Sequence, residues 1–365
     1  MSSNNKKILI ATGGTGGHIF PSLSLANFLK TKYELHIITD KRGLKYLDNK
    51  EKINIKTINS GTVFKKNLFQ TFVGIIKVFF SFISSTFYLI ILRPQLVIGM
   101  GGYSSFPVCI ASYCLRIPVI IYENNLVIGR ANKFLLSISK AILVATSNVQ
   151  GIDPKYKKKV FSSGYLIRSQ ILNLKKDEIQ NSEKKNLSIL ITGGSQSAKI
   201  FGEILPNIIT RCCEKGIKFK IYQQCLDKQI DQIKKLYEKS KLEFELFSFS
   251  DDISKYFKKA DLAITRSGAS SLAELVNLRI PFIAIPLPSS ADNHQFENAN
   301  YFSKKGYCFL LEEKFVSDKL FEILADLNKD IKKLFLMKER MAEHSDKDVF
   351  SKTERVIKKI LNEQN

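Results

Sequence analysis

The chain has 365 residues, more than one typical hydrophobic core uses, so its length suits two domains. Apolar residues make up 44% of it and charged residues 25%, which is ordinary for a globular protein. The formal net charge of +22 points to an anionic partner or to AT-rich codon usage, and we attribute it mainly to codon usage. The sequence contains no zinc knuckle, RNP-like aromatic motif or helix-turn-helix pattern, so we expect no nucleic-acid partner.

The cysteine pattern argues against a metal centre. No CxxC pair occurs, and we interpret the six cysteines as reduced thiols of a cytosolic protein. They are Cys109, Cys114, Cys212, Cys213, Cys225 and Cys308. Lys6 and Lys7 lead directly into an apolar run, so we expect no signal peptide.

Short apolar runs alternate with helix-like stretches such as 21–31 and 129–138, which is typical of parallel, doubly wound sheets. A polar run within 165–186 separates two halves. We therefore expect an α/β fold with two Rossmann-like domains that face a cleft, residues 1–164 and residues 165–344. Strands are predicted at 7–12, 34–39, 96–100, 118–122, 141–145, 160–164, 187–192, 218–223, 243–247, 261–265 and 281–285.

The charged tail from Ile331 onward is also expected to be helical. We expect a helix at about 345–365 to pack back on the first domain. The apolar residues of the tail are spaced to form one stripe: Met337, Met341, Val349, Val356, Ile357 and Ile360.

The segment from Leu68 to Leu92 contains a single charged residue, Lys77, and many phenylalanines. It is long enough to span a bilayer, but serines and a threonine dilute its centre, and a crossover helix is needed at this place. Two interpretations stay open: a helix packed on all sides, or a helix that dips into an anionic leaflet. The residues expected to contact the membrane are Phe72, Ile76, Phe79, Phe80 and Phe82.

Three glycine-rich loops, at 13–17, 99–102 and 193–194, follow predicted strands. The segment ILIATGG at 8–14 is similar in sequence to the segment ILITGG at 189–194. A strand that feeds a glycine turn at a helix N-terminus forms an anion site, because free backbone N–H groups and the helix dipole point at the turn. Two such units suggest two similar domains that share one phosphorylated substrate.

The first loop is not a Walker A loop and lacks the third glycine of the dinucleotide pattern. Asp40, however, ends the second strand, where an acid reads the ribose of NAD in dehydrogenases. An NAD-dependent oxidoreductase is therefore a rival, although the missing glycine and the second glycine-loop domain count against it.

Three further features suit a sugar nucleotide. His18 follows the first loop, where a neutral imidazole near a helix N-terminus can accept a proton. Glu274 lies roughly two turns into a helix, where its carboxylate can accept two ribose hydroxyls. The run 292–295 offers donors and acceptors for sugar hydroxyls. Each also has a structural interpretation: a packed histidine, a solvated glutamate and a helix cap.

Six motifs together resemble the MurG family of bacterial N-acetylglucosaminyltransferases in order and spacing, over almost the whole chain. They are GGTGGH at 13–18, GMGGYSSFP at 99–107, ENN at 123–125, GGSQSAK at 193–199, DLAITRSGASSLAEL at 261–275 and ADNHQFENA at 291–299. The resemblance implies an inverting, metal-independent transferase of the B type in glycosyltransferase family 28. Its N-terminal domain would face the acceptor and the membrane, and its C-terminal domain would bind the UDP-sugar.

The resemblance also implies the reaction. N-acetylglucosamine would move from UDP-N-acetylglucosamine to the 4-hydroxyl of undecaprenyl-pyrophosphoryl-N-acetylmuramoyl-pentapeptide (lipid I to lipid II) in peptidoglycan biosynthesis, and so serve cell shape and division. No cofactor would be required. The protein would lie peripherally on the cytoplasmic face of the bacterial inner membrane, with the anionic membrane surface as a partner.

Carried over by position, His18 is the candidate base and Glu123 the runner-up, and no residue is expected to bind a metal. Arg168 and Ser195 would serve the donor phosphates. Glu274 would bind the ribose, and Asn125 and Gln295 the sugar. The implied substrate-binding residues are Thr15, Gly16, Gly17, Gly101, Gly102, Tyr103, Asn125, Arg168, Ser195, Gln196, Ala269, Ser270, Ser271, Leu272, Ala273, Glu274 and Gln295.

The chain departs from the family pattern at three places. Tyr122 stands where histidine is usual, which argues against a catalytic role for that position. Tyr165, Leu166 and Ile167 stand where Asn-Pro-Val is usual, which alters the segment between the domains. Ser197 replaces a usual glycine, so this loop must avoid positive φ there.

Two alternatives remain beside the oxidoreductase. One is a GT-B transferase with another lipid acceptor, such as a diacylglycerol. The other is a non-catalytic membrane-surface protein, which would explain the charge and the phenylalanines but not Glu274 with the run 292–295.

Overall fold

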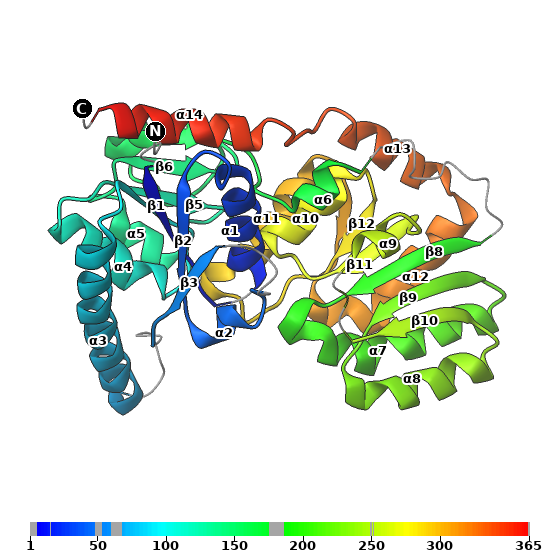
Figure 1. Ribbon diagram of the computed structural model, residues 1–365. Coiled ribbons are helices and arrows are strands. Elements are labelled where there is room, and N and C mark those ends of the chain that lie inside the picture. Colours follow the sequence, from blue (N-terminus) through cyan, green and yellow to red (C-terminus); the bar gives the residue numbers. More distant parts are fainter. Residues whose placement is uncertain are drawn as a thin grey trace. The chain divides into compact units, whose positions relative to one another are not determined.

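The computed structural model describes residues 6–14, 16–47, 53–59, 68–174, 186–248, 250 and 252–363. The chain divides into two compact units (Figure 1). Unit 1 comprises Met1–Arg168 and Asp346–Asn365, and unit 2 comprises Ser169–Ser345. The chain thus leaves unit 1 after Arg168 rather than at the expected Gly164, and it returns at Asp346.

Unit 1 contains a seven-stranded parallel sheet with the order β3-β2-β1-β4-β5-β6-β7. Its strands are β1 (Lys7–Ala11), β2 (Glu34–Thr39), β3 (Asn54–Thr57), β4 (Leu96–Gly99), β5 (Val119–Glu123), β6 (Ala141–Val144) and β7 (Val160–Ser162). The central strands are buried along nearly their whole length, as expected where helices cover both faces of a parallel sheet.

The helices of unit 1 cover the two faces of this sheet. They are α1 (Gly16–Leu29), α2 (Lys41–Leu44), α3 (Leu68–Leu92), α4 (Ser105–Cys114), α5 (Arg130–Leu135), the 3-10 helix η1 (Pro154–Lys159) and α14 (Val349–Asn362). Leu9 and Val97 of the sheet share one core cluster with residues of α3, α4 and α5. On the other face α1 contacts α14, where the rings of Phe28 and Phe350 stack at 5.1 Å between centroids.

Unit 2 contains a six-stranded parallel sheet with the order β10-β9-β8-β11-β12-β13. Its strands are β8 (Leu187–Thr192), β9 (Phe219–Gln224), β10 (Glu243–Phe247), β11 (Leu262–Thr265), β12 (Phe282–Ala284) and β13 (Cys308–Leu310). Its helices are α6 (Ser169–Leu172), α7 (Gly194–Glu214), α8 (Asp227–Lys239), α9 (Ser254–Phe257), α10 (Ala269–Asn277), α11 (His294–Lys304), α12 (Val316–Lys329) and α13 (Lys332–Met341), with short 3-10 helices at Ala291–Asn293 and Glu313–Phe315.

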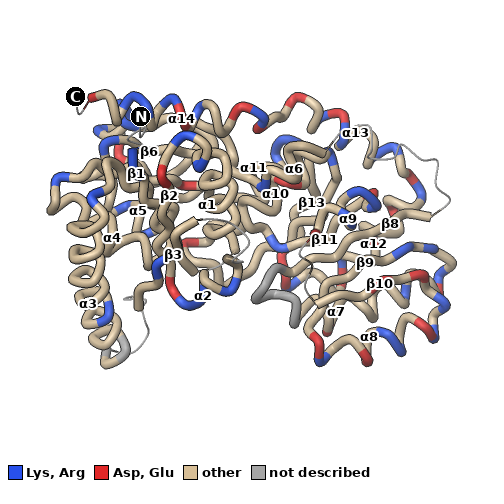
Figure 2. Tube along the Cα trace, viewed as in Figure 1, with Lys and Arg blue, Asp and Glu red and all other residues tan. Residues whose placement is uncertain are grey.

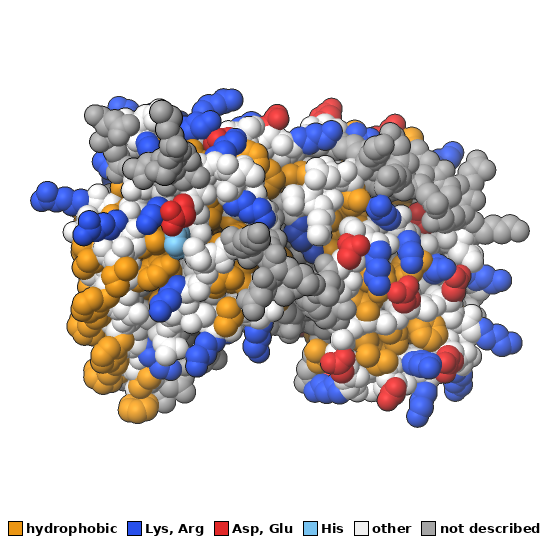
Figure 3. All heavy atoms as spheres, in the orientation of Figure 1, with side chains coloured by type: hydrophobic (Ala, Val, Ile, Leu, Met, Phe, Trp, Pro, Cys, Tyr) orange, Lys and Arg blue, Asp and Glu red, His pale blue; other side chains and the backbone are white. Residues whose placement is uncertain are grey.

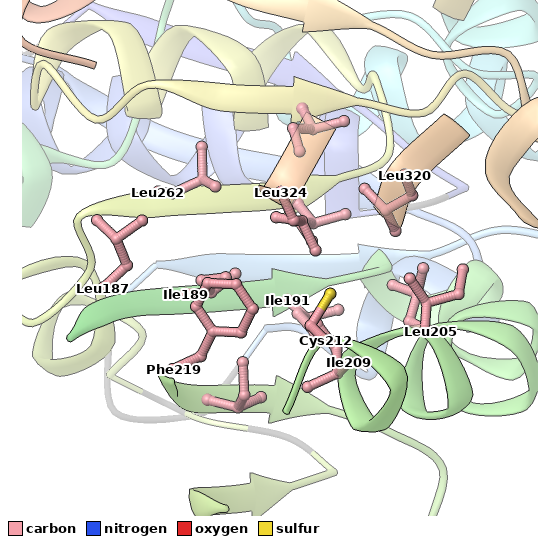
Figure 4. Close-up of a cluster of buried hydrophobic side chains, with 14 of the residues drawn as sticks. Leu187, Ile189, Ile191, Leu205, Ile209, Cys212, Phe219, Leu262, Leu320 and Leu324 are labelled. Atoms are coloured by element: carbon pink, nitrogen blue, oxygen red, sulfur yellow. The ribbon is translucent and has the colours of Figure 1, made fainter. Parts of the chain in front are cut away.

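The core of unit 2 forms where α7 and α12 cover one face of the sheet. Figure 4 shows Ile189 and Ile191 of β8 pointing toward side chains of α7, among them Ile209, with Leu324 of α12 nearby. Alternate residues of a strand point to opposite faces, so these two isoleucines share a face by virtue of their spacing.

Both sheets follow the Rossmann strand order, in which the third, second, first, fourth, fifth and sixth strands of the unit are neighbours. The expected α/β fold with two Rossmann-like domains is therefore confirmed. In each unit the strand order reverses beside the first strand, between β1 and β4 or between β8 and β11. Ligands bind outside the carboxyl ends of strands at such a switch point.

Every predicted strand is present within two residues of its expected ends, but the sequence analysis missed β3 and β13. Both lie at sheet edges, where a short strand needs no apolar period: Asn54–Thr57 is mostly exposed, and Cys308–Leu310 has three residues. The expectation of one apolar stripe along the tail was wrong, because its residues divide between α13 in unit 2 and α14 in unit 1.

Candidate functional site

The loops that follow β1 and β4 pack backbone against backbone in unit 1. Gly14, Gly101 and Gly102 have φ values of +87°, +86° and +79°. A Cβ atom at Gly102 would lie 2.6 Å from the carbonyl oxygen of Gly13. Glycine is therefore needed both for the left-handed conformation and for the close approach. Two of the three predicted glycine loops thus form one surface at the switch point of the sheet.

His18 lies in the first turn of α1, against the second of these loops. A Cβ atom at Gly101 would lie 2.9 Å from Cε1 and 3.0 Å from Nδ1 of the imidazole. The candidate base and the predicted residues Gly101 and Gly102 therefore lie together, with Gly16 and Gly17 in the same first turn. Tyr103 directly follows this loop, and Thr15 lies outside the described residues.

Glu123, the runner-up base, organises the loop that follows β5. It is 2% exposed. Its Oε1 accepts hydrogen bonds from the backbone N–H and from Nδ2 of Asn125, both at 3.0 Å. Its Oε2 accepts from the backbone N–H of Gly129 at 2.8 Å and from Nδ2 of Asn132 at 3.0 Å. With both oxygens engaged twice, the carboxylate is placed to hold Asn125, and we no longer favour it as a base.

The neighbouring Asn124 joins this loop to α1. Its Nδ2 donates to the carbonyl oxygen of Gly17 at 3.4 Å, and the side chain is buried. The loops after β1, β4 and β5 therefore converge on the first turn of α1. The ENN run, weak as a sequence motif, has a structural reason for its position beside the glycine loops.

Asp40 does not have the free carboxylate that a dehydrogenase needs for ribose, so that hypothesis was wrong. It caps α2: its Oδ1 accepts from the backbone N–H groups of Arg42 and Gly43, both at 2.9 Å. Its Oδ2 accepts from Nε and Nη2 of Arg42 and from Oγ of Ser104 at 2.9 Å. Burial opposes ionisation, but the hydrogen bonds from Arg42, Gly43 and Ser104 outweigh it and lower the pKa of Asp40.

Arg168, expected to serve the donor phosphates, is the last residue of unit 1 before the chain enters unit 2. Its guanidinium carbon lies 5.3 Å from the centroid of the Phe20 ring. That ring in turn contacts the glycine loop, because a Cβ atom at Gly16 would lie 2.8 Å from its Cε2. The cation is thus positioned beside α1 by stacking on an aromatic ring.

In unit 2 the third glycine loop passes directly from β8 into α7. Ser195 and Gln196 lie in the first turn of α7, but their side chains lie outside the described part of the structure. Ser197 also falls within this helix, so its backbone does not need the left-handed conformation that favours glycine.

Arg266 is a buried cation within the motif at 261–275, and its role is not apparent from the sequence. It directly follows β11, at the switch point of the sheet, and forms an ion pair with Glu313. Its Nη1 donates to the carbonyl oxygens of Ile285 at 3.3 Å and Pro286 at 3.2 Å. A guanidinium engaged in this way fixes the loop after β12 relative to β11.

Gln295 and Asn298 of α11 brace the same loops. Oε1 of Gln295 accepts from the backbone N–H of Ser267 at 3.2 Å and of Leu287 at 3.0 Å. Nδ2 of Asn298 donates to the carbonyl oxygen of Ser267 at 3.1 Å. The amide oxygen of Gln295 is therefore used inside the protein, so a sugar hydroxyl would meet its amide nitrogen. Asn298 is a second residue to which the sequence analysis gave no role.

The stretch Ala269–Glu274 forms the first turns of α10, directly after the β11 loop. Leu272 and Ala273 are fully buried, so their side chains serve packing and only their backbone can meet a ligand. Ser270 and Ser271 reach the surface, whereas Glu274 is 4% exposed. A carboxylate buried to this degree is costly unless it is hydrogen-bonded, so Glu274 is held within the first turns of α10 rather than solvated as a surface glutamate would be.

Helix α3 turns most of its large apolar side chains outward. Ser81, Ser85, Leu89 and Leu92 form its buried stripe, while Phe72, Ile76, Phe79 and Phe80 are exposed. Only 22% of the most apolar stretch of this helix, within Thr71–Leu92, is buried. The interpretation as a helix packed on all sides was therefore wrong. Phe82 packs against the core cluster and was wrongly assigned to the outward face.

The outward face of α3 forms a continuous apolar surface in Figure 3. In Figure 2 the helix is almost free of charged residues, whereas Lys and Arg are scattered over the other elements. Helix α3 is long and apolar enough to cross a membrane by length and composition. In this surface, which we call the α3 face, the exposed residues are Phe69, Phe72, Ile75, Ile76, Phe79, Phe80, Phe87, Ile90 and Ile91.

Among the described residues, no group of three or more His, Cys, Asp and Glu side chains is arranged to hold a metal ion. All six cysteines are free thiols. Burial raises the pKa of the Cys109 thiol to about 12, so it stays protonated and inert.

Models of two known domains match the chain. The N-terminal domain of glycosyltransferase family 28 matches residues 8–144, and the C-terminal domain of that family matches residues 188–353. The chain belongs to glycosyltransferase family 28. It is therefore a glycosyltransferase, as expected, and the oxidoreductase alternative is excluded.

Individual proteins are similar to this chain over most of their length. The UDP-N-acetylglucosamine--N-acetylmuramyl-(pentapeptide) pyrophosphoryl-undecaprenol N-acetylglucosamine transferase of Pelagibacter ubique (strain HTCC1062) is 36% identical over 98% of this chain and 99% of its own. The protein of the same name from Rickettsia felis is 35% identical over 88% and 91%. The crystal structure of MurG from Acinetobacter baumannii, 25% identical, superposes with a TM-score of 0.77 over 97% and 99%.

Two departures of this family 28 chain from the MurG pattern are hydrogen-bonded to each other. The hydroxyl of Tyr122 accepts from the backbone N–H of Leu166 at 2.9 Å and donates to the carbonyl oxygen of Gly164 at 3.3 Å. Leu166 is fully buried, so its N–H needs this partner. A proline at 166, which the resemblance to the family would place there, has no N–H and would not need this hydroxyl. Oδ1 of Asp346 accepts from the next N–H along the segment, that of Tyr165, at 2.9 Å.

Proposed function

We propose that this family 28 enzyme transfers N-acetylglucosamine from UDP-N-acetylglucosamine to the 4-hydroxyl of undecaprenyl-pyrophosphoryl-N-acetylmuramoyl-pentapeptide. The observation that carries the proposal is the 36% identity, over 98% of the chain, to a protein whose name states this donor sugar and this acceptor. The glycine loops of unit 1 and the buried Glu274 of unit 2 suit the diphosphates and the ribose that the reaction involves.

In the proposed reaction the acceptor oxygen attacks C1 of the donor sugar from the face opposite the UDP group. A new C1–O4 bond forms, the bond from C1 to the phosphate oxygen breaks, and the configuration at C1 is inverted. His18 takes the proton of the hydroxyl, because it is the imidazole beside the glycine loops of unit 1. The negative charge that develops on UDP is stabilised by the N-terminus of α7, and Arg168 supplies a further cation.

The test is transfer of radiolabel from UDP-N-acetylglucosamine by the purified full chain. Label should enter the lipid fraction only when the muramoyl-pentapeptide lipid is present, and UDP-glucose should be a poorer donor. A chain that instead labels diacylglycerol would be a transferase with a different lipid acceptor. Label that appears as free sugar without any acceptor would contradict the assignment as well.

We further propose that the α3 face binds the cytoplasmic surface of the inner membrane peripherally. A row of exposed phenylalanines and isoleucines is costly in water, and its burial in lipid contributes about 25 cal/mol per Å². The formal net charge of +22 favours an anionic leaflet, with about 1 kcal/mol for each Lys or Arg near the surface. A surface position also brings a water-soluble donor to a lipid-bound acceptor.

Co-sedimentation with vesicles of anionic phospholipid, at low and high salt, tests this binding. Wild type should sediment with the vesicles and be partly released by salt, whereas Phe79→Ser with Phe80→Ser should bind less. Phe335→Ser with Leu336→Ser is the matched control, because these residues are exposed on α13 outside the α3 face. Equal binding by both double variants would refute the role of α3. Resistance to salt and alkali would instead indicate a span.

A further inference from the structure

Arg42 places a cation against the first glycine loop of unit 1. Its side chain is 52% exposed. A Cβ atom at Gly14 would lie 3.9 Å from Nη2 of Arg42, and no other described residue beyond Gly14's immediate chain neighbours comes within 4 Å of that position. Among the described residues that are not adjacent in the chain, the guanidinium is therefore the group that borders the space beside Gly14.

The guanidinium is held in place by the buried carboxylate of Asp40. Nε and Nη2 of Arg42 both donate to Oδ2 of Asp40, at 3.2 and 2.7 Å. The same oxygen accepts from Ser104, directly after the second glycine loop. A Cβ atom at Gly13 would clash with Oγ of Ser104. Asp40 therefore fixes Arg42 relative to both glycine loops.

The remaining donors of this guanidinium suit a phosphate. Nη1 of Arg42 makes no hydrogen bond to any residue that the structure describes. Arg is the residue best shaped for phosphate oxygens, because its planar fork donates two parallel hydrogen bonds. Positive-φ glycines beside a helix N-terminus add backbone N–H groups that favour an anion at the same place.

The chemistry of the proposed reaction decides which diphosphate binds here. In the acceptor, the 4-hydroxyl and the diphosphate on C1 belong to the same sugar ring. A base that takes the proton from that hydroxyl therefore lies within one sugar ring of the acceptor diphosphate. His18 packs on Gly101, and Gly102 packs on Gly13, so the candidate base and Arg42 border the same pair of loops.

We propose that Arg42 binds the diphosphate of the lipid acceptor and that Asp40 is the positioning residue that orients its guanidinium. The inference rests on the proposed function, which names the acceptor. It adds a substrate contact in the segment after β2, outside the six motifs that indicated the family.

The experiment measures initial rates of the full chain with a soluble, short-chain prenyl-pyrophosphoryl-N-acetylmuramoyl-pentapeptide. Arg42→Gln should raise the KM for this acceptor about tenfold or more, as expected when a charged hydrogen bond is lost. Its kcat and its KM for UDP-N-acetylglucosamine should stay within about twofold of wild type. Lys41→Gln is the matched control, because it removes the same charge from the exposed neighbouring residue and should leave both KM values unchanged.

The positioning role of Asp40 predicts that the effects of Asp40→Asn and Arg42→Gln on the acceptor KM are not additive. Asp40→Asn should raise the acceptor KM in the wild-type background and add little in the Arg42→Gln background. If Asp40 only supports the fold, Asp40→Asn would lower kcat equally in both backgrounds, and the positioning role would be overturned. A melting curve for each variant confirms that it is folded.

Two outcomes would overturn the Arg42 contact while the proposed function stands. In one, Arg42→Gln leaves the acceptor KM unchanged; in the other, it raises the donor KM instead, which would assign the guanidinium to UDP. Calorimetric titration with inorganic pyrophosphate gives an independent measure, and equal affinity of wild type and Arg42→Gln would also refute the contact. Failure of wild type to use any muramoyl acceptor would refute the proposed function, and with it the assignment of Arg42 to this acceptor.

Discussion

Replacement of Tyr122 by phenylalanine tests the hydrogen bond that joins β5 to the segment leaving unit 1. The change removes one hydroxyl and leaves the ring in place. Burial raises the pKa of Tyr122, so the phenol stays protonated and both accepts from Leu166 and donates to Gly164. Without it the N–H of Leu166, which is 0% exposed, loses its partner.

The expected cost follows from this geometry. A buried N–H left without a partner costs about 1–3 kcal/mol, and the 3.3 Å bond to Gly164 adds little because it is long. For a domain of about 150–250 residues each kcal/mol lowers Tm by about 2–4 °C, so a loss of about 2 kcal/mol lowers Tm by about 4–8 °C. Urea unfolding followed by circular dichroism gives the free energy of unfolding directly.

Two controls make the result specific. Tyr113→Phe removes the hydroxyl of a tyrosine exposed on α4 and should change stability by less than about 0.5 kcal/mol. In a Leu166→Pro background Tyr122→Phe should cost much less, because proline has no N–H to satisfy. The reasoning is refuted if Tyr122→Phe is as stable as wild type, or if it costs the same in both backgrounds.

Three further outcomes are expected. His18→Ala should keep donor affinity and lower kcat by about two orders of magnitude or more, as general-base loss does; near-normal turnover would move the base elsewhere. Glu274→Ala should weaken UDP-N-acetylglucosamine binding at least about tenfold in calorimetry, through lost hydrogen bonds worth about 1.5–3 kcal/mol, and unchanged affinity would contradict the ribose assignment. The pKa of Asp40 is lower in the folded protein than in the unfolded chain, where it is about 3.9. The ionised carboxylate therefore contributes its full stabilisation at pH values above about 3.9. This contribution is lost as the pH falls through the folded pKa. Urea unfolding below about pH 4 should therefore show a steeper loss for wild type than for Asp40→Asn, and parallel profiles would count against it.

The sequence by itself determined the two-domain α/β architecture. Buried parallel strands such as β1 and β8 are continuous apolar runs that end at glycine pairs, and this pattern depends only on neighbouring residues. The glycine loops were readable for the same reason, because a positive φ as at Gly14 restricts the residue type locally. The position of His18 beside such a loop was predictable because His18 directly follows Gly16 and Gly17 in the sequence.

What only the tertiary structure decided depends on partners far apart in the chain. Helix α3 reverses the usual polarity, because Ser81 and Ser85 are buried while Phe79 and Phe80 are exposed, whereas the apolar pattern alone would place the apolar side inward. Asp40 kept a dehydrogenase open as a rival, because its partner Ser104, 64 residues later, is not visible in the sequence.

The same reason applies to one carboxylate and one cation of unit 1. Glu123 was the runner-up base in the sequence, where its hydrogen bonds from Asn125, Gly129 and Asn132 could not be seen. Arg42 lacked any motif, and it became a candidate only when folding placed it beside Gly14. Local sequence specifies which elements form, because φ preference and apolar period are properties of short segments. The hydrogen-bond partners that decide whether a polar side chain is available to a substrate are set by packing between those segments.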